Sequence, residues 1–447
     1  MASAGSILGN AVHRLEDPTL LTGDGKYLDD LVETGMLYIA FVRSAVAHGT
    51  IESVDISDAA SMPGVVGVYH SRGDDLGLAP VQGFAMMPET YNRPVFATDK
   101  VRFVGDIVAA VVAETQAQAN DAAETVLVDY DVLPAIIHAP DGMKEDAPLL
   151  FPEAGSNICF ASQFPEGGTD EDPCEGAAAV GEVRMVSQRL AGVPMENNGA
   201  VAVPDADGDG LTLWLTHQAP HSVHAGYAPA LGLDPEKLRV ACPWVGGGFG
   251  PKAAAYVEHI AAGAIALKLQ KPAKWIEARS EDMVALVHGR DYVMHARLGV
   301  GQDGKIVGLD ASVVAAAGAY PAIGAILPML TQMMSVGVYE IPKVRFDAKT
   351  VLTNNTTVGA YRGAGRPEAT QLIERVIDAA AAEIGMDPAE IRRANFMQPD
   401  TFPRTTITGG AYDSGEYEKA LDAALEASGY AGLREVQAGH QVHAAEQ

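Results

Sequence analysis

The sequence predicts an α+β fold, and three observations support that class. The chain has 447 residues, 48% of them apolar and 20% charged, which is enough apolar material to bury a large core in roughly two to four domains. Short β-branched runs alternate with helix-forming runs along the first third of the chain. The same alternation resumes in longer elements after about residue 185. This pattern favours layered domains of helices packed on sheets.

The first part of the chain, to about residue 135, is predicted to be a small α+β domain. Its expected strands are short and apolar, and a run of helix-forming residues separates two of them. We expect strands at Val65–Tyr69, on both sides of Gly105-Asp106 within Val101–Ala113, and at Thr125–Tyr130, with a helix at Glu114–Glu124.

A connecting segment and a longer α/β stretch are predicted next. Residues 136–185 are rich in Pro, Gly and Asp and show no sustained period, so they are predicted to connect two domains. The best-defined helix follows Pro367, where apolar residues recur every three or four positions until Gly385. The other elements expected are strands at Leu211–Thr216 and Leu238–Val245, helices at Asp234-Pro235, Tyr256–Leu269, Asp387-Pro388 onward and Glu416–Ala427, and a polar tail from Leu433.

The net charge excludes nucleic acids and anionic membrane surfaces as main partners. The 31 Lys and Arg residues against 58 Asp and Glu residues give a formal charge of −27, whereas both partners require a cationic face. Residues Ala311–Tyr339 carry no charge, and this stretch is longer than the roughly 20 residues of a membrane span. Because it is mostly Ala, Gly, Ser and Thr with two prolines inside it, we expect buried core and no membrane span.

The three cysteines predict a reducing, cytoplasmic compartment. Cys159, Cys174 and Cys242 are far apart, with no CxxC pair and no histidine at ligand spacing. This spacing argues against a disulfide framework and against a Cys-ligated zinc or iron–sulfur site on this chain.

The strongest local motif is Val245–Lys252 (VGGGFGPK), between an expected strand and an expected helix. Its glycines allow a tight turn in which successive backbone N–H groups face one point beside a helix N-terminus, a seat for an oxyanion or a phosphate. Pro251 and Ala253 do not fit a P-loop, and Pro251 also breaks a dinucleotide fingerprint. The alternative is a glycine turn that only lets strand and helix pack.

A second motif, Gly359–Glu368 (GAYRGAGRPE), places two arginines among glycines before a long helix. Arg362 and Arg366 are able to present guanidinium groups and backbone donors to an anion or a carbonyl. The alternative is that both arginines pair with nearby carboxylates, as expected in an acidic protein.

A third motif, Thr216–His221 (THQAPH), stands at the end of an expected strand. Pro220 is incompatible with the helix that would align His217 and His221 as metal ligands, so we do not expect zinc there. Gln218 remains as a neutral hydrogen-bonding group. Among the many acids, Glu196, Glu258 and Glu277 are expected to be solvated or salt-bridged, not catalytic.

With further short segments in the same order, these motifs resemble the molybdenum-cofactor subunit of the molybdenum hydroxylase, or xanthine oxidase, family. The matching segments are Arg14–Pro18, Leu21–Gly23, Tyr27–Asp30, Met195-Glu196, Gln218, Gly246–Lys252, Trp275–Asp282, His288–Arg290, Ala360–Glu368, Ile373–Arg375 and Tyr412–Gly415. They cover nearly the whole chain. The resemblance implies an α/β hammerhead domain followed by the first molybdenum-cofactor-binding domain.

The resemblance also implies a division of the chain and the place of its site residues. The division is an N-terminal arm (1–18), a hammerhead domain (19–135), a connecting segment (136–185), a cofactor-binding domain (186–400) and a C-terminal extension (401–447). By position, Gln218 would reach an oxo ligand of molybdenum, and Arg362 would lie beside the substrate and stabilise negative charge on it. The residues that would contact the cofactor are Gln218, Gly247, Gly248, Phe249, Gly250, Arg362 and Gly363. No residue is expected to ligate the metal directly, since the pterin holds it.

Departures from the family pattern refine these expectations. One-chain members continue for several hundred residues, and that part supplies most dinucleotide-binding loops and the glutamate that serves as general base. We therefore expect a second molybdenum-binding subunit to supply them. Gly363 stands where aerobic carbon monoxide dehydrogenases have a copper-binding cysteine, and Ala253 stands where purine-oxidising members have a glutamate. Neither carbon monoxide nor xanthine is therefore the expected substrate. Asn197-Asn198 replaces the commoner Pro-Arg.

The function implied is hydroxylation of an N-heterocycle or an aldehyde with oxygen derived from water. The expected cofactor is molybdenum with molybdopterin, in its cytosine dinucleotide form. Electrons would pass to two-iron two-sulfur clusters and FAD on separate subunits, because this chain has no cysteine set for a cluster. The alternative is a non-catalytic scaffold subunit that shapes the pocket of a partner holding the cofactor. A nicotinamide-dependent enzyme would need a fingerprint that is missing here.

Overall fold

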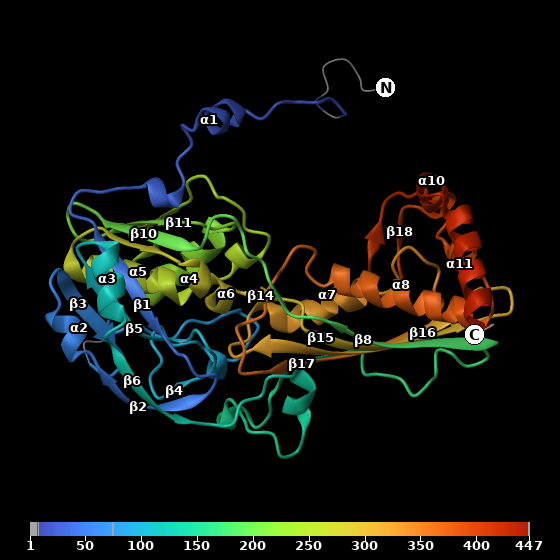
Figure 1. Cartoon of the computed structure of the whole chain (residues 1–447), viewed down its shortest axis with the longest axis horizontal. Coiled ribbons are helices and arrows are strands. Elements are labelled where there is room, and N and C mark those ends of the chain that lie inside the picture. Colours follow the sequence, from blue (N-terminus) through green and yellow to red (C-terminus); the bar gives the residue numbers. More distant parts are fainter. Residues whose placement is uncertain (1–6, 8, 74–75, 446–447) are drawn as a thin grey trace.

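Two large sheets lie side by side along an elongated molecule in the computed structural model (Figure 1), which describes residues 7, 9–73 and 76–445. Helices cover both sheets, so the α+β class is confirmed. The helices are α1 (Asp17–Thr22), α2 (Ser57–Ser61), α3 (Gln116–Ala123), α4 (Pro220–Ala230), α5 (Val257–Leu269), α6 (Arg279–Ala285), α7 (Leu327–Met334), α8 (Arg366–Glu383), α9 (Pro388–Asn395), α10 (Tyr417–Ser428) and α11 (Tyr430–Ala445).

The first sheet combines strands from two distant parts of the chain. Its order is β12 (Leu238–Ala241), β11 (Leu211–Leu215), β10 (Gly199–Pro204), β13 (Ala273–Ile276), β1 (Leu37–Arg43), β5 (Ile107–Ala113) and β3 (Val65–His70). The two parts join where β1 runs parallel to β13, with Leu37 opposite Ala273. Strand β5 is buried along its whole length, as its unbroken apolar text after Gly105-Asp106 predicts.

Helices cover the first sheet on both faces, since side chains alternate along each strand. Ile39 and Phe41 of β1 share a core with α4 and α5, whereas Ala40 faces α3. Trp275 and Tyr227 are the largest side chains buried in the α4–α5 core. A smaller sheet lies beside the first one, in the order β4 (Lys100–Val101), β2 (Gly49–Asp55) and β6 (Leu127–Val132).

The second sheet extends away from the first and carries α8 on one face (Figure 1). Its order is β7 (Ile158–Phe164), β17 (Val344–Leu352), β16 (Ile306–Gly318), β15 (Tyr292–Val300) and β8 (Ala179–Ser187). Gly181 of β8 lets the helix approach closely, because a Cβ there would lie 2.3 Å from the backbone nitrogen of Ala380. Two short pairs complete the strands: β9 (Leu190–Ala191) with β14 (His288–Gly289), and β18 (Arg404–Thr405) with β19 (Ala411–Tyr412).

Most predicted elements are present. The helix expected at Asp234-Pro235 is a single 3-10 turn, Pro235–Lys237, and the strand expected before Gly105 ends at Val101. Three further differences are larger. Helix α8 follows Gly365 and ends before Gly385, and α9 begins where the Asp387 carboxylate accepts the Ala389 N–H at 2.8 Å. Within residues 136–185 the structure has β7 and β8, which the sequence did not indicate because their strand partners, β17 and β15, are distant in the chain. Strand β12 stops at Ala241, four residues earlier than expected.

The third difference is at the end of the chain, where the expected polar tail is the helix α11. Its residues are mostly good helix formers, and Gly429 in the left-handed conformation separates it from α10. The uncharged stretch Ala311–Tyr339 forms part of β16 and the helix α7, packed in the core as predicted. Among the described residues, no helix is long and apolar enough to cross a membrane.

Candidate functional site

Two neighbouring parallel strands bring the first two motifs together. Strands β11 and β12 run parallel, so the segments that leave their carboxyl ends meet at the same edge of the sheet. Gln218 follows β11, and the glycine loop, residues 246–250, follows β12. The Gly250 N–H donates to Oε1 of Gln218 at 2.7 Å, and the Gln218 N–H donates to the Lys252 carbonyl at 2.9 Å. The structure therefore places Gln218 directly against the glycine loop.

The glycine loop has a backbone that side chains would disrupt. Gly247 and Gly250 have φ values of 101° and 103°, and Phe249 between them has 53°. A Cβ on Gly248 would lie 2.5 Å from the Gln218 side chain, and one on Gly250 would lie 2.4 Å from the Ala360 carbonyl oxygen. The glycines are thus needed for the close approach of three chain segments.

Three backbone donors of this loop have no protein acceptor. Within the part of the chain that the structure describes, the N–H groups of Gly247, Gly248 and Phe249 donate to nothing, whereas those of Gly246 and Gly250 are bonded. Successive free N–H groups in a left-handed turn form a concave anion site. This cradle fits a group that offers several oxygen acceptors, such as the molybdenum cofactor expected from the sequence.

The arginine motif reaches the same place from the second sheet. The Arg362 N–H donates to the Phe249 carbonyl at 2.8 Å, and the Arg362 guanidinium lies 5.9 Å from the centre of the Phe249 ring. Its side chain is exposed. Gly363, with φ of 100°, makes the turn that follows.

Neither arginine of this motif has a carboxylate partner among the described residues. The Arg362 guanidinium has only the Phe249 ring, and Arg366 donates to the Gly363 carbonyl. The carboxylate pairing that the sequence left open is therefore not found. The Arg362 guanidinium remains available to a ligand at the exposed side of the glycine loop, where Gln218, Phe249 and Arg362 reach the surface; this place is the mouth of the site.

A buried ion pair braces the glycine loop from behind. The Glu196 carboxylate accepts the Gly246 N–H at 2.6 Å and the Lys252 ammonium at 3.2 Å. The Lys252 ammonium also donates to the Glu196 carbonyl at 2.8 Å, and its side chain is fully buried. Burial lowers the pKa of Lys252, and the Glu196 carboxylate opposes that shift. The pair thus joins the two ends of the loop.

Arg290 braces the arginine motif in a similar way, and sequence reasoning did not single it out. Its guanidinium donates to the carbonyls of Tyr361 at 3.0 Å and Arg362 at 2.8 Å, and it pairs with the Glu368 carboxylate at 3.2 Å. The only signal in the sequence was its place in the segment His288–Arg290. The residues next to Arg290 in the sequence do not indicate that its guanidinium bonds to the carbonyls of Tyr361 and Arg362, which lie far along the chain.

Family models match most of the chain. A molybdopterin cofactor-binding domain matches residues 150–396, more than half of the sequence. The a/b hammerhead domain of aldehyde oxidase and xanthine dehydrogenase matches residues 22–134. The chain belongs to the molybdenum hydroxylase family.

Individual molybdenum hydroxylases agree with this assignment. The carbon monoxide dehydrogenase large chain of Hydrogenophaga pseudoflava is 35% identical over 444 residues, which are 95% of this chain and 55% of that one. The crystal structure of quinoline 2-oxidoreductase from Pseudomonas putida 86 superposes with a TM-score of 0.90 at 32% identity, covering 97% of this chain and 56% of that one. The chain therefore spans about half the length of these relatives.

Another molybdenum hydroxylase subunit has a matching length. The nicotinate dehydrogenase large molybdopterin subunit of Eubacterium barkeri is 29% identical over 434 residues. The alignment covers 95% of this chain and 98% of that subunit.

Three acids and one histidine near the site have defined surroundings, and one of the acids differs from its prediction. Glu196 and Glu258 form ion pairs, as predicted. The prediction that Glu277 is solvated or salt-bridged is wrong, because Glu277 is buried and has no ion pair among the described residues. Burial raises the pKa of Glu277 well above its usual range, against the pull of Arg43, so this acid can fold inside as a neutral group. His217 accepts the Ala219 N–H through Nδ1 at 2.9 Å and contacts the Ala254 carbonyl through Nε2 at 3.0 Å.

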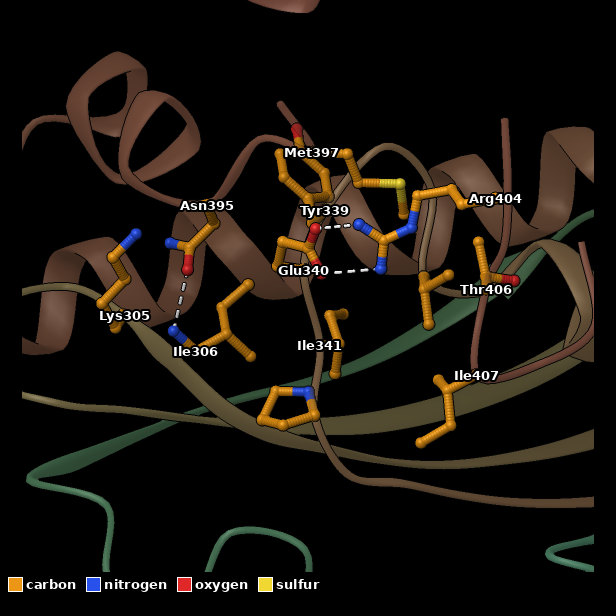
Figure 2. Close-up of a pocket in the computed structure, with 12 residues that line it drawn as sticks. Lys305, Ile306, Tyr339, Glu340, Ile341, Asn395, Met397, Arg404, Thr406 and Ile407 are labelled. Atoms are coloured by element: carbon orange, nitrogen blue, oxygen red, sulfur yellow. Dashed lines mark hydrogen bonds and ion pairs between the residues drawn. The ribbon is translucent and has the colours of Figure 1, made fainter. Parts of the chain in front are cut away.

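A separate hollow of about 400 Å³ lies at the other end of the second sheet (Figure 2). It adjoins the starts of the parallel strands β16 and β17, whereas the arginine motif follows the end of β17. Its polar groups bond to the protein: Lys305 to the Ala394 carbonyl, Arg404 to Glu340, and Asn395 to the Ile306 N–H at 2.9 Å. The free donors of the glycine and arginine motifs do not line this hollow.

Proposed function

We propose that this chain is the molybdenum-cofactor-binding, catalytic subunit of a multi-subunit molybdenum hydroxylase that acts on an N-heterocycle or an aldehyde. Support comes from the names of its relatives, which include a quinoline oxidoreductase and a nicotinate dehydrogenase molybdopterin subunit. Electrons would pass to iron–sulfur and FAD subunits, because the three separate cysteines of this chain do not form a cluster site. These unpaired cysteines also support a cytoplasmic location as part of the proposal.

One observation carries the proposal: the segments that carry a free arginine, a carboxamide and three free N–H groups are bonded to one another. When bound there, the molybdenum cofactor supplies the two-electron oxidation of a substrate carbon with oxygen from water. Gly247, Gly248 and Phe249 would hold the cofactor through their N–H groups, and Gln218 would orient it with its carboxamide. Gly363, with a φ of 100°, would lie beside it.

Arg362 would act on the substrate. Its guanidinium has no carboxylate to neutralise it, so it is able to stabilise negative charge that develops on a heterocycle or a carbonyl during oxidation. Gly363 has no side chain to ligate a second metal, and Ala253 has no carboxylate to accept protons from a purine. Both features favour the proposed substrates over carbon monoxide and xanthine.

The proposal includes a second molybdenum-binding subunit. That subunit would supply the glutamate general base and the remaining contacts to the cofactor, in its cytosine dinucleotide form. Support comes from the exposure of Gln218, Phe249 and Arg362 on this chain. An open cofactor mouth of this kind is expected to be covered in the working enzyme, which excludes water.

Metal and pterin analysis of separated subunits tests the proposal. The chain would be expressed alone and together with the protein encoded downstream, in a host that makes the cofactor. We expect molybdenum and turnover of quinoline, nicotinate or an aromatic aldehyde only in the complex, with loss of cofactor when the glycine loop is altered. If the partner alone kept full molybdenum and pterin, the chain would be the non-catalytic scaffold instead.

A further inference from the structure

The Arg362 peptide is held from both sides. Its N–H donates to the Phe249 carbonyl, and its own carbonyl accepts from Nη2 of Arg290 at 2.8 Å. The same guanidinium donates through Nη1 to the Tyr361 carbonyl at 3.0 Å. The two terminal nitrogens of one planar guanidinium therefore hold two consecutive carbonyls. The single ammonium nitrogen of a lysine is unable to reproduce this fork-like geometry.

Arg290 is itself built into a costly backbone conformation. Arg290 and Asp291 have φ values of 64° and 73°, a left-handed pair without glycine. The surrounding contacts hold this pair: the Asp291 N–H donates to the Ser187 carbonyl at 2.9 Å, and the Asp291 carboxylate pairs with Arg189 at 2.9 Å. Strain that persists in this way is concentrated at functional sites. Here it directs the Arg290 side chain toward the arginine motif.

Arg290 does not reach the mouth of the site. Its side chain is only 11% exposed, and its guanidinium lies 5.0 Å from the centre of the Tyr361 ring. Its charge is balanced by Glu368, which is 2% exposed on the first turn of α8. Any effect of Arg290 on substrate must therefore pass through the residues it holds.

We propose that Arg290 is a positioning residue that fixes the backbone of Tyr361 and Arg362 and so sets the direction of the Arg362 guanidinium. This rests on the proposed function, in which Arg362 stabilises charge on the substrate. Within the described part of the chain, the Arg362 side chain has no ion pair, and its guanidinium contacts the Phe249 ring. Its direction is decided by the peptide that carries it, and Arg290 determines that peptide.

The first test is amide hydrogen exchange in the assembled holoenzyme, comparing wild type with Arg290→Gln and Arg290→Lys. We expect exchange in the peptide covering residues 359–366 to become at least about tenfold faster in both variants, since lysine keeps the charge but not the fork. Unchanged exchange there in Arg290→Gln would overturn the proposal. So would a lysine variant identical to wild type, because charge alone would then suffice.

A matched control is available at the other end of α8. Arg392 is also partly buried, donates to two backbone carbonyls and pairs with a carboxylate of the helix, Glu374. Arg392→Gln removes the same kind of contact without touching the arginine motif. It should leave exchange in residues 359–366 at the wild-type rate, and faster exchange there would overturn the assignment to Arg290.

The second test is a double-mutant cycle on turnover. Arg290→Gln should lower kcat about tenfold with little change in KM, as expected for a misplaced catalytic group. In an Arg362→Met background the same change should have less than about a twofold effect, because its target is gone. A full effect in that background would overturn the proposal. If wild type turns over neither quinoline, nicotinate nor an aromatic aldehyde, the proposed function fails. The hydrogen-exchange test still decides whether Arg290 fixes the backbone of Tyr361 and Arg362.

Discussion

The N–H of Arg362 donates a hydrogen bond of 2.8 Å to the carbonyl oxygen of Phe249. Phe249 lies in the loop after a strand of the first sheet, and Arg362 follows a strand of the second sheet. This bond therefore fastens the two sheets together at the mouth of the site. Five predictions follow from the contacts around it.

Replacing Arg362 tests its role on the substrate. Arg362→Met should lower kcat/KM by about 10²- to 10³-fold, or about 3 to 4 kcal/mol of transition-state stabilisation. The melting temperature should hardly change, because the guanidinium has no ion pair to lose among the described residues. Arg366→Met is the control and should leave specific activity per molybdenum near normal. Normal activity in Arg362→Met would require withdrawal of the catalytic assignment.

Replacing Gln218 tests the carboxamide. Gln218→Ala removes the acceptor of the Gly250 N–H and the proposed contact with the cofactor. Turnover per enzyme should fall at least about tenfold, as for the loss of one oriented polar group, while pterin content stays near wild type. Steady-state kinetics and pterin fluorescence on one preparation decide this. Wild-type turnover would remove Gln218 from the site.

A methyl group on Gly250 should disrupt the junction of the loops. In Gly250→Ala the new Cβ would lie 2.4 Å from the Ala360 carbonyl oxygen, at a φ of 103°. We expect a loss of about 2 to 4 kcal/mol in stability, together with loss of molybdenum. Gly155→Ala is the matched control, since Gly155 also has a positive φ but open space around it. It should cost only about 1 kcal/mol. Equal costs in the two variants would contradict the close packing.

Two buried glutamates should respond differently to the same change. Burial, the largest single effect, opposes the charge of Glu258, but the Arg43 guanidinium at 2.9 Å and the charge of Arg93 together lower the pKa of that carboxyl. Burial raises the pKa of Glu277 well above its usual range, so it favours the neutral form of that acid. Glu258→Gln should therefore cost about 2 to 4 kcal/mol, whereas Glu277→Gln should change stability by less than about 1 kcal/mol. Urea unfolding at pH 7 measures both, and a reversed order would refute the assignment.

His288 should make folding sensitive to mild acid. Burial, with help from the Arg189 charge, lowers the pKa of His288 to about 4 from its usual 6.5. Between those pH values His288 is protonated in the unfolded chain but not in the folded chain. The free energy of unfolding therefore falls as the pH falls from about 6.5 to 4, by at most about 3 kcal/mol. Below pH 4 both states are protonated and this loss stops growing.

The comparison of wild type with His288→Gln isolates that contribution from the other titrating groups. The difference in unfolding free energy between the two proteins should shrink by about 1 kcal/mol or more from pH 7 to pH 5. A constant difference across this range would show that His288 is readily protonated in the folded protein.

The sequence indicated the motifs that the structure brings together more fully than it indicated the supports behind them. Gln218, the glycines of residues 246–250 and Arg362 are unusual residue types in short motifs, and the parallel pair β11–β12 brings two of those motifs together. The elements with a strong local period, such as α8, were also predictable. In contrast, Arg290 bonds to carbonyls far along the chain, and the raised pKa of Glu277 comes from its burial in the folded chain. Such contacts have no local pattern. The strands β7 and β8 were missed for the same reason, because their partners lie elsewhere in the sequence.

Because β1 pairs with β13 in a parallel arrangement, the first sheet is built from two separate regions of the sequence. Cutting the chain between them would leave each fragment with an unsatisfied interior strand edge, prone to aggregation. The two regions should therefore melt in one cooperative calorimetric transition, not in two steps. The two regions therefore form one structural unit, and the glycine loop follows the strand β12 at the edge of their common sheet.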